Sequence, residues 1–514
     1  RDHQMNHNLF DTFAARMRER GNAPFITTRE GRHYSYQDAL NESAQLAGAL
    51  TALGVNVGDR VAVQVDKSPE AILLYLACLR IGGVYLPLNT GYTGDEISYF
   101  LKDAEPALFV CRPSDIDTAR AIARDTGCPA VETLGTDADG SLMEKAQQSD
   151  PRDDIVTLGE RDLAAILYTS GTTGRSKGAM LTHRNLASNA ETLVSSWHFS
   201  AEDRLIHALP IFHTHGLFVA CNVTLMAGAS MCFLPKFDAD VIFDELPKGS
   251  VMMGVPTFYT RLVQDPRLTA EVTAHMRLFV SGSAPLTAET HEAFEAKTGH
   301  AILERYGMTE TCGIITSVAA DFFIDKPDSA GPAMPNFEAK CVNDLGETVA
   351  QGEVGELWVR GSSVIKGYIN RPEATAESIT DGWLHTGDIA RIDEHGFIFI
   401  VDRKKDMVLR GGENVYCAEV EAAIYRHPSV AECSVFGVPD DRLGEEVGVA
   451  VVLKPGEDLA AVTLREHCAG IMAKHKVPRY VWFLTALPRN ASGKFIKRDL
   501  KEQLTKELDS AAAN

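Results

Sequence analysis

The sequence has no long hydrophobic run and few basic residues for its length. No stretch reaches about 18 apolar residues without a charge, the length typical of a membrane-spanning helix, so we expect no membrane span. Lys and Arg total 50 against 70 Asp and Glu, which gives a net charge of −20. Because such a surface repels a phosphate backbone over most of its area, we expect no nucleic-acid partner. Any ligand that carries phosphate would need a locally positive site.

Closely spaced cysteine pairs are also missing, and we expect no secretory signal. The ten cysteines contain no C-x-x-C pair, and several lie within apolar runs such as "LYLACLRIG". This pattern is typical of buried, reduced thiols in a cytoplasmic protein. The first residues, "RDHQMNHNLF", lack the apolar segment of a secretory signal. We therefore predict a cytoplasmic location.

The length of 514 residues exceeds what one hydrophobic core usually supports. Residues 60–88 predict a strand, a helix and a second strand, with Ser68 as N-cap, Pro69 at the first helical position and Gly82-Gly83 at the helix end. Further short apolar runs alternate with helical patterns up to about residue 335. This alternation indicates parallel sheets that are covered by helices on both faces.

The sequence pattern changes twice after that region. From about residue 335, glycines bound short strands without a long helix between them, as in a small barrel-like β subdomain. Past residues 402–406, helices and strands form a compact α+β segment. We predict an α/β protein with a large N-terminal domain of two parallel-type sheets, residues 5–403, in which about 335–403 are β-rich. A small, mobile C-terminal domain would follow at residues 404–514.

The segment "YTSGTTGRSKGAM", residues 168–180, has the composition of an anion-binding loop. It follows an apolar strand and precedes a plausible helix start, which places it at the carboxyl end of a parallel strand. Glycines let backbone amides converge on an anion, and the hydroxyls add donors. The spacing does not fit a Walker A loop. A flexible glycine-rich surface loop is the structural alternative.

Five further segments join this loop in a recognisable order. They are "GSAP" (282–285), "ERYGMTE" (304–310), "WLHTGD" (383–388), "DRKKDMVLRGGENVY" (402–416) and "PRNASGK" (488–494). In order and spacing, the chain resembles the adenylate-forming acyl-CoA synthetase superfamily, or AMP-binding enzymes, over essentially its whole length. The resemblance implies a carboxylic acid substrate, ATP, Mg²⁺ and coenzyme A. The carboxylate would attack the α-phosphate of ATP, and the thiol of coenzyme A would then displace AMP.

The resemblance also implies roles for single residues in the nucleotide reaction. Lys494 would bridge the acyl carboxylate and the α-phosphate, Glu310 would hold Mg²⁺, and Thr309 would belong to the catalytic set. Tyr306 would stack on adenine, while Asp388 and Arg403 would contact the ribose. The other implied ATP- or AMP-binding residues are Thr169, Ser170, Gly171, Thr172, Thr173, Gly174, Lys177, Ser283, Ala284, Pro285, Glu304, Arg305 and Gly307. Each has an ordinary alternative, such as a solvated lysine, a turn aspartate or a core tyrosine.

The second half-reaction is implied to use the C-terminal domain. Lys405 falls where the family has the hinge about which this domain rotates between the two steps. Gly411, Gly412 and Glu413 would then border the pantetheine arm of coenzyme A, because glycine permits close backbone approach. The alternative is a plain glycine turn.

The acid substrate depends on a second, narrower resemblance. The segments "ALPIFHTHGLFV", "VPTFYTRL" and "MRLFVSGSAPL" are similar to those of malonyl-CoA synthetases. There, Arg261 and Ser283 would hold a distal carboxylate, and His213 and Met308 would line the acyl site. A buried guanidinium needs an anion, but Arg261 could also pair with an internal acid or reach solvent. His213 and His215 form an H-x-H pair that could bind a metal, although no third ligand with suitable spacing follows.

The sequence departs from the malonyl pattern after Thr311. It reads "CGIITSVAADFF" where "NMNTSNP" is expected, and this resembles synthetases for monocarboxylic acids. A short- or medium-chain monocarboxylate is therefore an alternative substrate, and a hybrid of two relatives is a hypothesis. Three competing functions are a peptide-synthetase adenylation module, a luciferase-like oxygenase and a non-catalytic nucleotide sensor. The sequence leaves the oligomeric state open.

Overall fold

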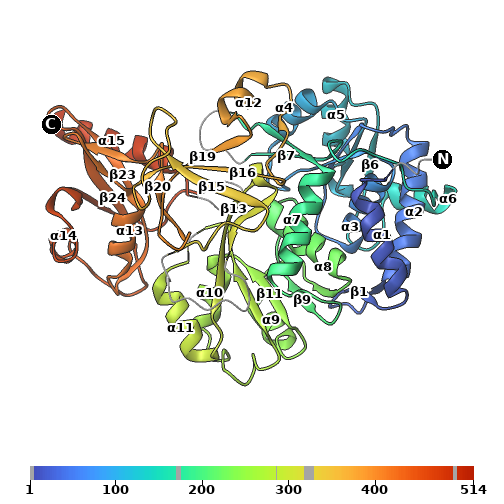
Figure 1. The fold of residues 1–514 in the computed structure, drawn as a ribbon, viewed down its shortest axis with the longest axis horizontal. Helices are drawn as coiled ribbons and strands as arrows, with labels where there is room; N and C mark the ends of the chain where they lie inside the picture. The colour runs from blue at the N-terminus through green and yellow to red at the C-terminus, as the bar shows by residue number, and fades with distance from the viewer. Residues whose placement is uncertain (1–4, 170–174, 285, 318–328, 490–494, 514) are drawn as a thin grey trace. The chain divides into compact units, whose positions relative to one another are not determined.

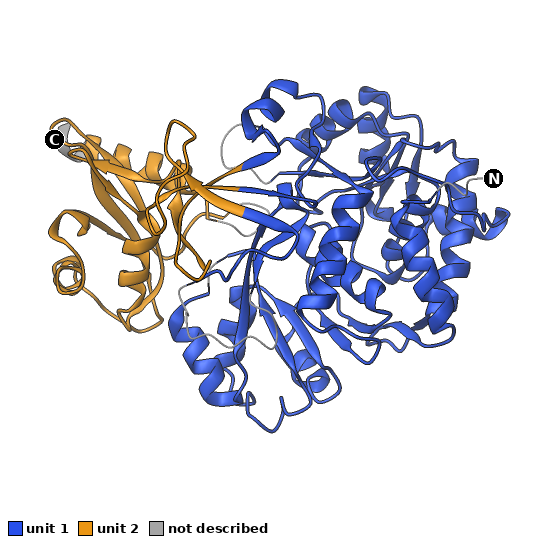
Figure 2. Cartoon of the chain, in the orientation of Figure 1, with its two compact units in different colours: residues 1–169, 175–338, 359–384 blue, residues 170–174, 339–358, 385–514 orange. Residues whose placement is uncertain are grey.

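The computed structural model describes residues 5–169, 175–284, 286–317, 329–489 and 495–513. Two compact units are distinguished in Figure 2. Of the described residues, unit 1 contains 5–169, 175–284, 286–317, 329–338 and 359–384, and unit 2 contains 339–358, 385–489 and 495–513. The α/β fold with a large N-terminal and a small C-terminal domain is confirmed, while the boundary after residue 403 stays a prediction.

One sheet of unit 1 has its parallel strands in the middle and an antiparallel strand at each edge. Its order is β14 (Gly313–Ser317), β13 (Ile302–Met308), β12 (Leu278–Ser281), β11 (Val251–Gly254), β9 (Arg204–His207), β10 (Ser230–Phe233), β1 (Pro24–Thr27) and β2 (His33–Ser35). All neighbours from β13 to β1 are parallel. The carboxyl ends of these strands therefore meet at one edge, where α/β proteins bind ligands.

The second sheet of unit 1 is also parallel at its centre. Its order is β17 (Gly367–Tyr368), β8 (Gly178–Thr182), β7 (Leu163–Tyr168), β4 (Val84–Pro87), β3 (Arg60–Gln64), β5 (Leu108–Cys111) and β6 (Val131–Thr133). The strands β8 and β17 join it in antiparallel pairing. The predicted unit at 60–88 is confirmed as β3, α3 (Pro69–Arg80) and β4. The Ser68 side chain caps the helix by accepting from the amide of Ala71.

Helices cover these sheets, as the ribbon in Figure 1 shows for unit 1. The remaining α-helices of unit 1 are α1 (Leu9–Arg20), α2 (Tyr36–Ala52), α4 (Gly94–Ala104), α5 (Ile116–Thr126), α6 (Ser141–Gln148), α7 (His183–Ser196), α8 (Asn222–Ala227), α9 (Ala239–Glu245), α10 (Pro256–Val263), α11 (Ala288–Thr298) and α12 (Pro372–Ser378). Three short helical turns complete the unit: the 3₁₀ turns η1 (Pro113–Asp115) and η3 (Thr309–Thr311), and the π-helix η2 (His215–Cys221).

Two further sheets contain the remaining strands. One has the order β15 (Phe337–Val342), β16 (Gly355–Gly361), β19 (Trp383–Ile392) and β18 (Ile379–Thr380), with β20 (Ile398–Arg403) also paired to β19. The other has the order β22 (Glu413–Val415), β21 (Val408–Arg410), β24 (Gly444–Leu453) and β23 (Val430–Asp440), with β25 (Tyr480–Phe483) on β24. Unit 2 also contains α13 (Cys417–Tyr425), α14 (Ala461–Ala469), η4 (Lys474–Lys476) and α15 (Lys497–Ala513).

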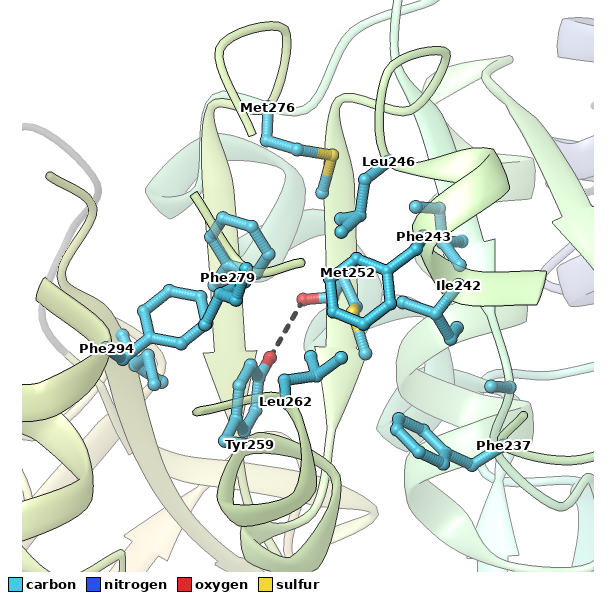
Figure 3. Packing of buried hydrophobic residues seen from close by; sticks show 14 of the residues in the cluster. Phe237, Ile242, Phe243, Leu246, Met252, Tyr259, Leu262, Met276, Phe279 and Phe294 are labelled. Atoms are coloured by element: carbon cyan, nitrogen blue, oxygen red, sulfur yellow. Dashed lines mark hydrogen bonds between the residues drawn. The ribbon is translucent and has the colours of Figure 1, made fainter. Parts of the chain in front are cut away.

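A cluster of buried apolar side chains packs α9, α10 and α11 against β11 and β12 (Figure 3). The hydroxyl of Tyr259 on α10 donates to the carbonyl oxygens of Val280, at 2.7 Å, and of Met252, at 3.4 Å. The hydroxyl is the only polar group of the Tyr259 side chain, and these bonds satisfy it inside the apolar cluster. The cluster thereby fixes α10 on the sheet edge where β11 and β12 end.

Two absences expected from the sequence can be compared with the described residues. Over the described ranges, none of the helices combines the length and the apolar character that crossing a membrane requires. All ten cysteines lie within those ranges and are free, and nine of them are buried. The expectation of unpaired thiols is thus confirmed, with Cys128 only half-buried.

The cluster in Figure 3 predicts a large stability cost for truncation. Leu246 is 0% exposed, so Leu246→Ala should lower the free energy of unfolding by about 2–5 kcal/mol through lost burial and a residual cavity. The same substitution at Leu345, which is 81% exposed, should change it by less than about 0.5 kcal/mol. Denaturant unfolding of both variants measures the difference. Equal effects would contradict the described packing.

Candidate active site

The ends of the glycine-rich loop are held together by two hydrogen bonds between Thr169 and Lys177. The amide of Thr169 donates to the carbonyl oxygen of Lys177 at 2.9 Å, and the Lys177 amide donates to the Thr169 hydroxyl at 3.2 Å. The predicted helix start after the loop is confirmed, because α7 begins at His183. Strand β8, which the sequence did not indicate, lies between the loop and this helix. The predicted phosphate ligands Ser170, Gly171, Thr172, Thr173 and Gly174 lie outside the described residues.

A cation, a phenol and a carboxylate meet beside this loop. The ammonium nitrogen of Lys177 lies over the ring of Tyr368, 4.9 Å from its centroid. The Tyr368 hydroxyl donates to Oε2 of Glu310 at 3.0 Å. Burial, followed by the negative charge of Glu310, raises the pKa of Tyr368, so the phenol stays a donor. Two residues implied by the resemblance, Lys177 and Glu310, are thus connected by a third that the sequence did not indicate.

The sheet register explains how Tyr368 reaches this position. Strand β17 pairs with β8, with Tyr368 opposite Ala179, and the Ile369 amide donates to the Gly178 carbonyl at 2.8 Å. On the other side, the Ile365 amide donates to the carbonyl oxygen of Glu310 at 3.0 Å. A strand of two residues is too short to show the alternating pattern by which strands are recognised in a sequence. The only sequence feature at Tyr368 is the short "KGY" segment.

The donor set around Glu310 fits a magnesium ion that is shared with a ligand. Mg²⁺ is usually held by one or two carboxylates together with phosphate oxygens and water. Within the described ranges, no group of three or more His, Cys, Asp or Glu side chains could enclose a metal. Glu310 offers hard carboxylate oxygens and is connected through Tyr368 to Lys177, so its chemistry fits such a shared ion. Bound there, Mg²⁺ would neutralise phosphate charge.

Strand β13 places the residues of the "ERYG" segment on alternating faces. Oε1 of Glu304 accepts from the amide of Leu286 at 2.7 Å, which anchors the end of the "GSAP" loop. Ser283 in that loop is exposed and has a φ of 75°, a conformation uncommon for a residue other than glycine. Ala284 is exposed as well, Pro285 lies outside the described residues, and Tyr306 follows on the same face as Glu304.

Arg305 points to the opposite face; its side chain is half-buried, and the Nε and Nη2 atoms are buried. Its Nε and Nη2 atoms have no hydrogen-bond partner among the described residues. A Cβ atom at Gly282 would lie 2.3 Å from the guanidinium carbon, so glycine at this position makes room for the group. Burial lowers the pKa of Arg305 to about 9, which leaves it charged at neutral pH.

The backbone is also closely packed at Gly307, two residues after Arg305. A Cβ atom at Gly307 would lie 1.8 Å from the carbonyl oxygen of Gly313, so only glycine fits there. The amide of Met308 donates to the hydroxyl of Thr311 at 3.2 Å, and η3, which contains Thr309 and Glu310, follows. Close pairing of β13 and β14 therefore positions the Glu310 carboxylate.

The predicted acyl-site residues lie in different environments. Arg261 is exposed, and its guanidinium lies over the ring of Phe237, 4.4 Å from the centroid. The premise of a buried guanidinium at Arg261 is therefore not met. His213 is half-buried, and its Nδ1 accepts from the amide of His215 at 3.4 Å. Their H-x-H pair belongs to no metal-binding group among the residues that the structure describes.

In unit 2, the two predicted ribose contacts are cross-strand neighbours. Asp388 on β19 lies directly opposite Arg403 on β20 in an antiparallel pair. The Asp388 amide donates to the Thr386 hydroxyl at 3.1 Å, and the Lys404 amide donates to the Gly387 carbonyl at 2.8 Å. Side chains at opposed positions of such a pair lie within reach of one ligand.

The predicted hinge residue, Lys405, lies two residues after Arg403. Lys405 is exposed, yet partial desolvation of its ammonium, together with the positive charge of Arg403, lowers its pKa. Beside it, the buried Asp402 accepts from the amides of Arg403 at 2.8 Å and of Cys417 at 2.7 Å. Burial raises the pKa of Asp402 to about 6 despite these bonds.

The predicted coenzyme A segment forms a tight hairpin. Gly411 and Gly412 connect β21 and β22, and both have positive φ angles, 57° and 85°, which glycine adopts without strain. The carboxylate of Glu413 pairs with Nε2 of His475 at 3.1 Å. The glycine turn thus lies between two strands, and the assignment to coenzyme A stays a prediction.

Lys494, the implied catalytic lysine, lies outside the described residues. The segments that flank it are paired, since Arg489 and Phe495 form an antiparallel bridge and the Ile496 amide donates to the Pro488 carbonyl at 3.0 Å.

Comparison with known proteins gives the following similarities. The AMP-binding enzyme family profile matches residues 13–369, and the AMP-binding enzyme C-terminal domain profile matches residues 419–494. The crystal structure of ATP-bound MatB from Rhodopseudomonas palustris is 50% identical, with a TM-score of 0.93 over 98% of this chain and 99% of that chain. O-succinylbenzoate coenzyme A synthetase (MenE) from Bacillus subtilis, in complex with ATP and magnesium ion, is 28% identical over 95% of this chain and 99% of that chain, with a TM-score of 0.85.

A curated relative bears a different substrate in its name. Feruloyl-CoA synthase from an Amycolatopsis species is 36% identical over 485 residues, which is 92% of this chain and 94% of that protein. The similarity thus extends over both units, while the names of similar proteins differ in the acid.

The raised pKa of Asp402 predicts how the stability of the protein depends on pH. The folded-state pKa of about 6 lies above the ordinary value of 3.8, so the folded state binds more protons between these values. The contribution of Asp402 to the free energy of unfolding should therefore fall by up to roughly 3 kcal/mol as the pH rises from about 4 to about 6. Asp402→Asn does not titrate. Denaturant unfolding at several pH values should show the wild-type advantage over this variant shrinking across that window, and a growing advantage would contradict the assignment.

Proposed function

Because the chain belongs to the AMP-binding enzyme family, in which it is an AMP-forming acid–CoA ligase, we propose that its acid substrate is malonate or methylmalonate. ATP, Mg²⁺ and coenzyme A are its co-reactants. The 50% identity to MatB, a malonyl-CoA synthetase, over nearly both whole chains is the observation that supports the acid. The feruloyl-CoA synthase is less similar, at 36% identity.

The chemistry explains why positive groups and donors are needed. In the first step a carboxylate oxygen forms a bond to the α-phosphorus of ATP, and the bond to the departing pyrophosphate breaks. Both reactants are anions, so most of the catalysis is positioning and electrostatic stabilisation. In the second step the thiol of coenzyme A attacks the acyl carbon, AMP leaves, and the thiol proton passes to solvent.

Residues of unit 1 supply part of that stabilisation in this proposal. Lys177 would hold the leaving pyrophosphate together with the loop that begins at Thr169, and Glu310 would hold Mg²⁺. Tyr368 would act as a positioning residue, because its hydroxyl fixes Glu310 and its ring lies under the Lys177 ammonium. The resemblance assigns the α-phosphate contact to Lys494, the ribose contacts to Asp388 and Arg403, and the adenine contact to Tyr306.

A monocarboxylic acid of short or medium chain is the second candidate. Ile314 and Ile315, in the segment where the malonyl pattern is polar, are both buried on β14. Apolar side chains next to β13 would favour an acyl chain over a second carboxylate. The names of the relatives, which include feruloyl-CoA synthase, are compatible with this alternative.

A panel of acids distinguishes the two candidates. With ATP, Mg²⁺ and coenzyme A present, kcat/KM for malonate or methylmalonate should exceed that for butyrate by about 100-fold or more, since a site built for a charged group rejects an analogue that lacks it. AMP formation is the readout. A preference for butyrate over malonate would eliminate the dicarboxylate proposal.

Substitution of Arg261 tests the contact that the resemblance implies. Because its guanidinium is exposed, Arg261→Met should raise KM for malonate only about two- to five-fold, as expected for a solvent-screened charge pair. Steady-state kinetics with malonate varied at saturating ATP measure this value. An unchanged KM would remove Arg261 from the acyl site.

Tyr368→Phe tests the positioning of Glu310. The variant keeps the ring under Lys177 but loses the bond to the carboxylate, so kcat/KM for MgATP should fall about tenfold or more, the usual effect of losing a charged hydrogen bond. The Mg²⁺ concentration for half-maximal rate should rise as well. Tyr425→Phe, which removes a hydroxyl that contacts Cys433 in unit 2, is the matched control. Identical Mg²⁺ dependence in both variants would refute the role of Tyr368.

A further inference from the structure

Helix α4 is fixed on the second sheet of unit 1 by its apolar face. Thr93 begins the helix as N-cap, and its hydroxyl accepts from the amide of Glu96 in a capping box. The ring of Phe100 lies 4.4 Å from the ring of Tyr168, between centroids. The other buried residues of α4 in the same cluster are Ile97, Leu101 and Ala104. Because Tyr168 is the last residue of β7, α4 lies against the strand end from which the glycine-rich loop starts.

Two polar side chains of α4 contact the chain before and after that loop. Tyr99 and Asp103 are four positions apart, so they lie on the same side of the helix. The hydroxyl of Tyr168, just before the loop, donates to Oδ2 of Asp103 at 2.8 Å. The hydroxyl of Tyr99 donates to the carbonyl oxygen of Ser176, the residue before Lys177, at 2.9 Å. One helix therefore holds both ends of the loop.

Arg371 connects α4 to a third segment. Its Nη2 atom donates to the hydroxyl of Tyr99 at 3.2 Å and lies 3.3 Å from Oδ1 of Asp103. Arg371 follows three residues after Tyr368, whose ring lies under the ammonium of Lys177. Helix α4 is thus bonded to the loop ends and also to the segment that contains the aromatic partner of Lys177.

These contacts are directional and partly shielded from water. The side chain of Asp103 is only 8% exposed, so the loss of a partner would leave a buried charge incompletely compensated. Burial and then the hydrogen bond to Asp103 raise the pKa of Tyr168, so this phenol stays a donor. The guanidinium of Arg175 lies over the ring of Tyr99, 4.6 Å from its centroid. Tyr99 therefore contacts two successive residues that lead to Lys177.

We infer that Tyr99 and Asp103 are positioning residues for the magnesium complex of ATP, because they hold the chain on both sides of the loop and thereby place Lys177. This inference rests on the proposed function, in which Lys177 holds the leaving pyrophosphate. Neither residue lies in the six segments that carry the family resemblance. A chain that is already held at both ends loses less conformational freedom when a phosphate binds. Loss of either contact should therefore weaken binding of ATP and of pyrophosphate.

Tyr99→Phe is the first test, since it keeps the ring under Arg175 and removes the hydroxyl. KM for ATP should rise about three- to tenfold, as expected for the loss of an ordinary hydrogen bond, and the inhibition constant of pyrophosphate should rise by the same factor. KM for coenzyme A and for the acid that the wild type prefers should stay within about twofold. Tyr92→Phe, in a ring 4.8 Å from that of Phe100 on the same helix, is the matched control and should match the wild type.

Asp103→Asn is the second variant. It keeps the size of the side chain but removes the charge that pairs with Arg371, so KM for ATP should rise about tenfold or more. The inhibition constant of pyrophosphate should follow it. A thermal unfolding curve of each variant shows that the chain is folded at the assay temperature.

A double-variant cycle with Lys177→Met separates positioning from a general effect on stability. Residues that act through one another are non-additive, so Tyr99→Phe should change KM for ATP by less than about twofold in the Lys177→Met background. A side chain that only stabilises α4 would lower the midpoint of thermal unfolding and would give the same factor in both backgrounds.

Two results would overturn the inference while the proposed function stands. One is a Lys177→Met variant with a raised KM for ATP, together with Tyr99→Phe and Asp103→Asn variants whose ATP and pyrophosphate constants match the wild type. The other is an equal effect of Tyr99→Phe with and without Lys177. Failure of the proposed role of Lys177 is recognised separately, as a Lys177→Met variant with unchanged ATP and pyrophosphate constants, and it would also remove the inference.

Discussion

The repulsion between anionic reactants is the constraint that organises this molecule. The chain has a net charge of −20, yet ATP, a carboxylate and coenzyme A all carry negative charge. Favourable binding must therefore come from cations and donors that the fold holds in place, because the average surface repels these ligands. Lys177, whose ammonium lies over the Tyr368 ring, and Arg305, whose Nε and Nη2 atoms are buried, are two such groups, and both lie on or beside strands of unit 1.

Backbone packing determines where these charges can lie. Glycine at 307 lets β13 and β14 approach so closely that η3 places Glu310 at the end of the pair. Glycine at 282 gives the Arg305 guanidinium its space. The pairing of β17 with β8 adds Tyr368 to the same region. Each contact is a steric or hydrogen-bonding requirement of the sheets, and the chemistry of the site follows from it.

Much of the fold could be predicted from local sequence signals. The unit at residues 60–88 was predicted because its N-cap, its proline and its terminal glycines act within one turn of the helix they bound. The strand β17 was missed because it is only two residues long and is stabilised by a partner almost two hundred residues away. Tertiary pairing of that kind leaves no local pattern.

The candidate site shows the same division between local and non-local information. The motif residues could be identified in the sequence, and Asp388 and Arg403 do lie opposite each other. The burial of single side chains could not be predicted from these motifs. Arg261, in an apolar segment, is exposed and lies over the Phe237 ring, whereas Arg305, in a charged segment, has buried Nε and Nη2 atoms. Which guanidinium lacks an anion depends on packing between β13, the loop at Gly282 and neighbouring elements.

The most direct test of the account is a crystal structure of the protein with ATP and Mg²⁺ bound. The account predicts phosphate density against Lys177 and the amide end of the loop at Thr169, a metal ion on the Glu310 carboxylate, and adenine against Tyr306. A nucleotide bound away from these residues, or a metal held by other side chains, would contradict it.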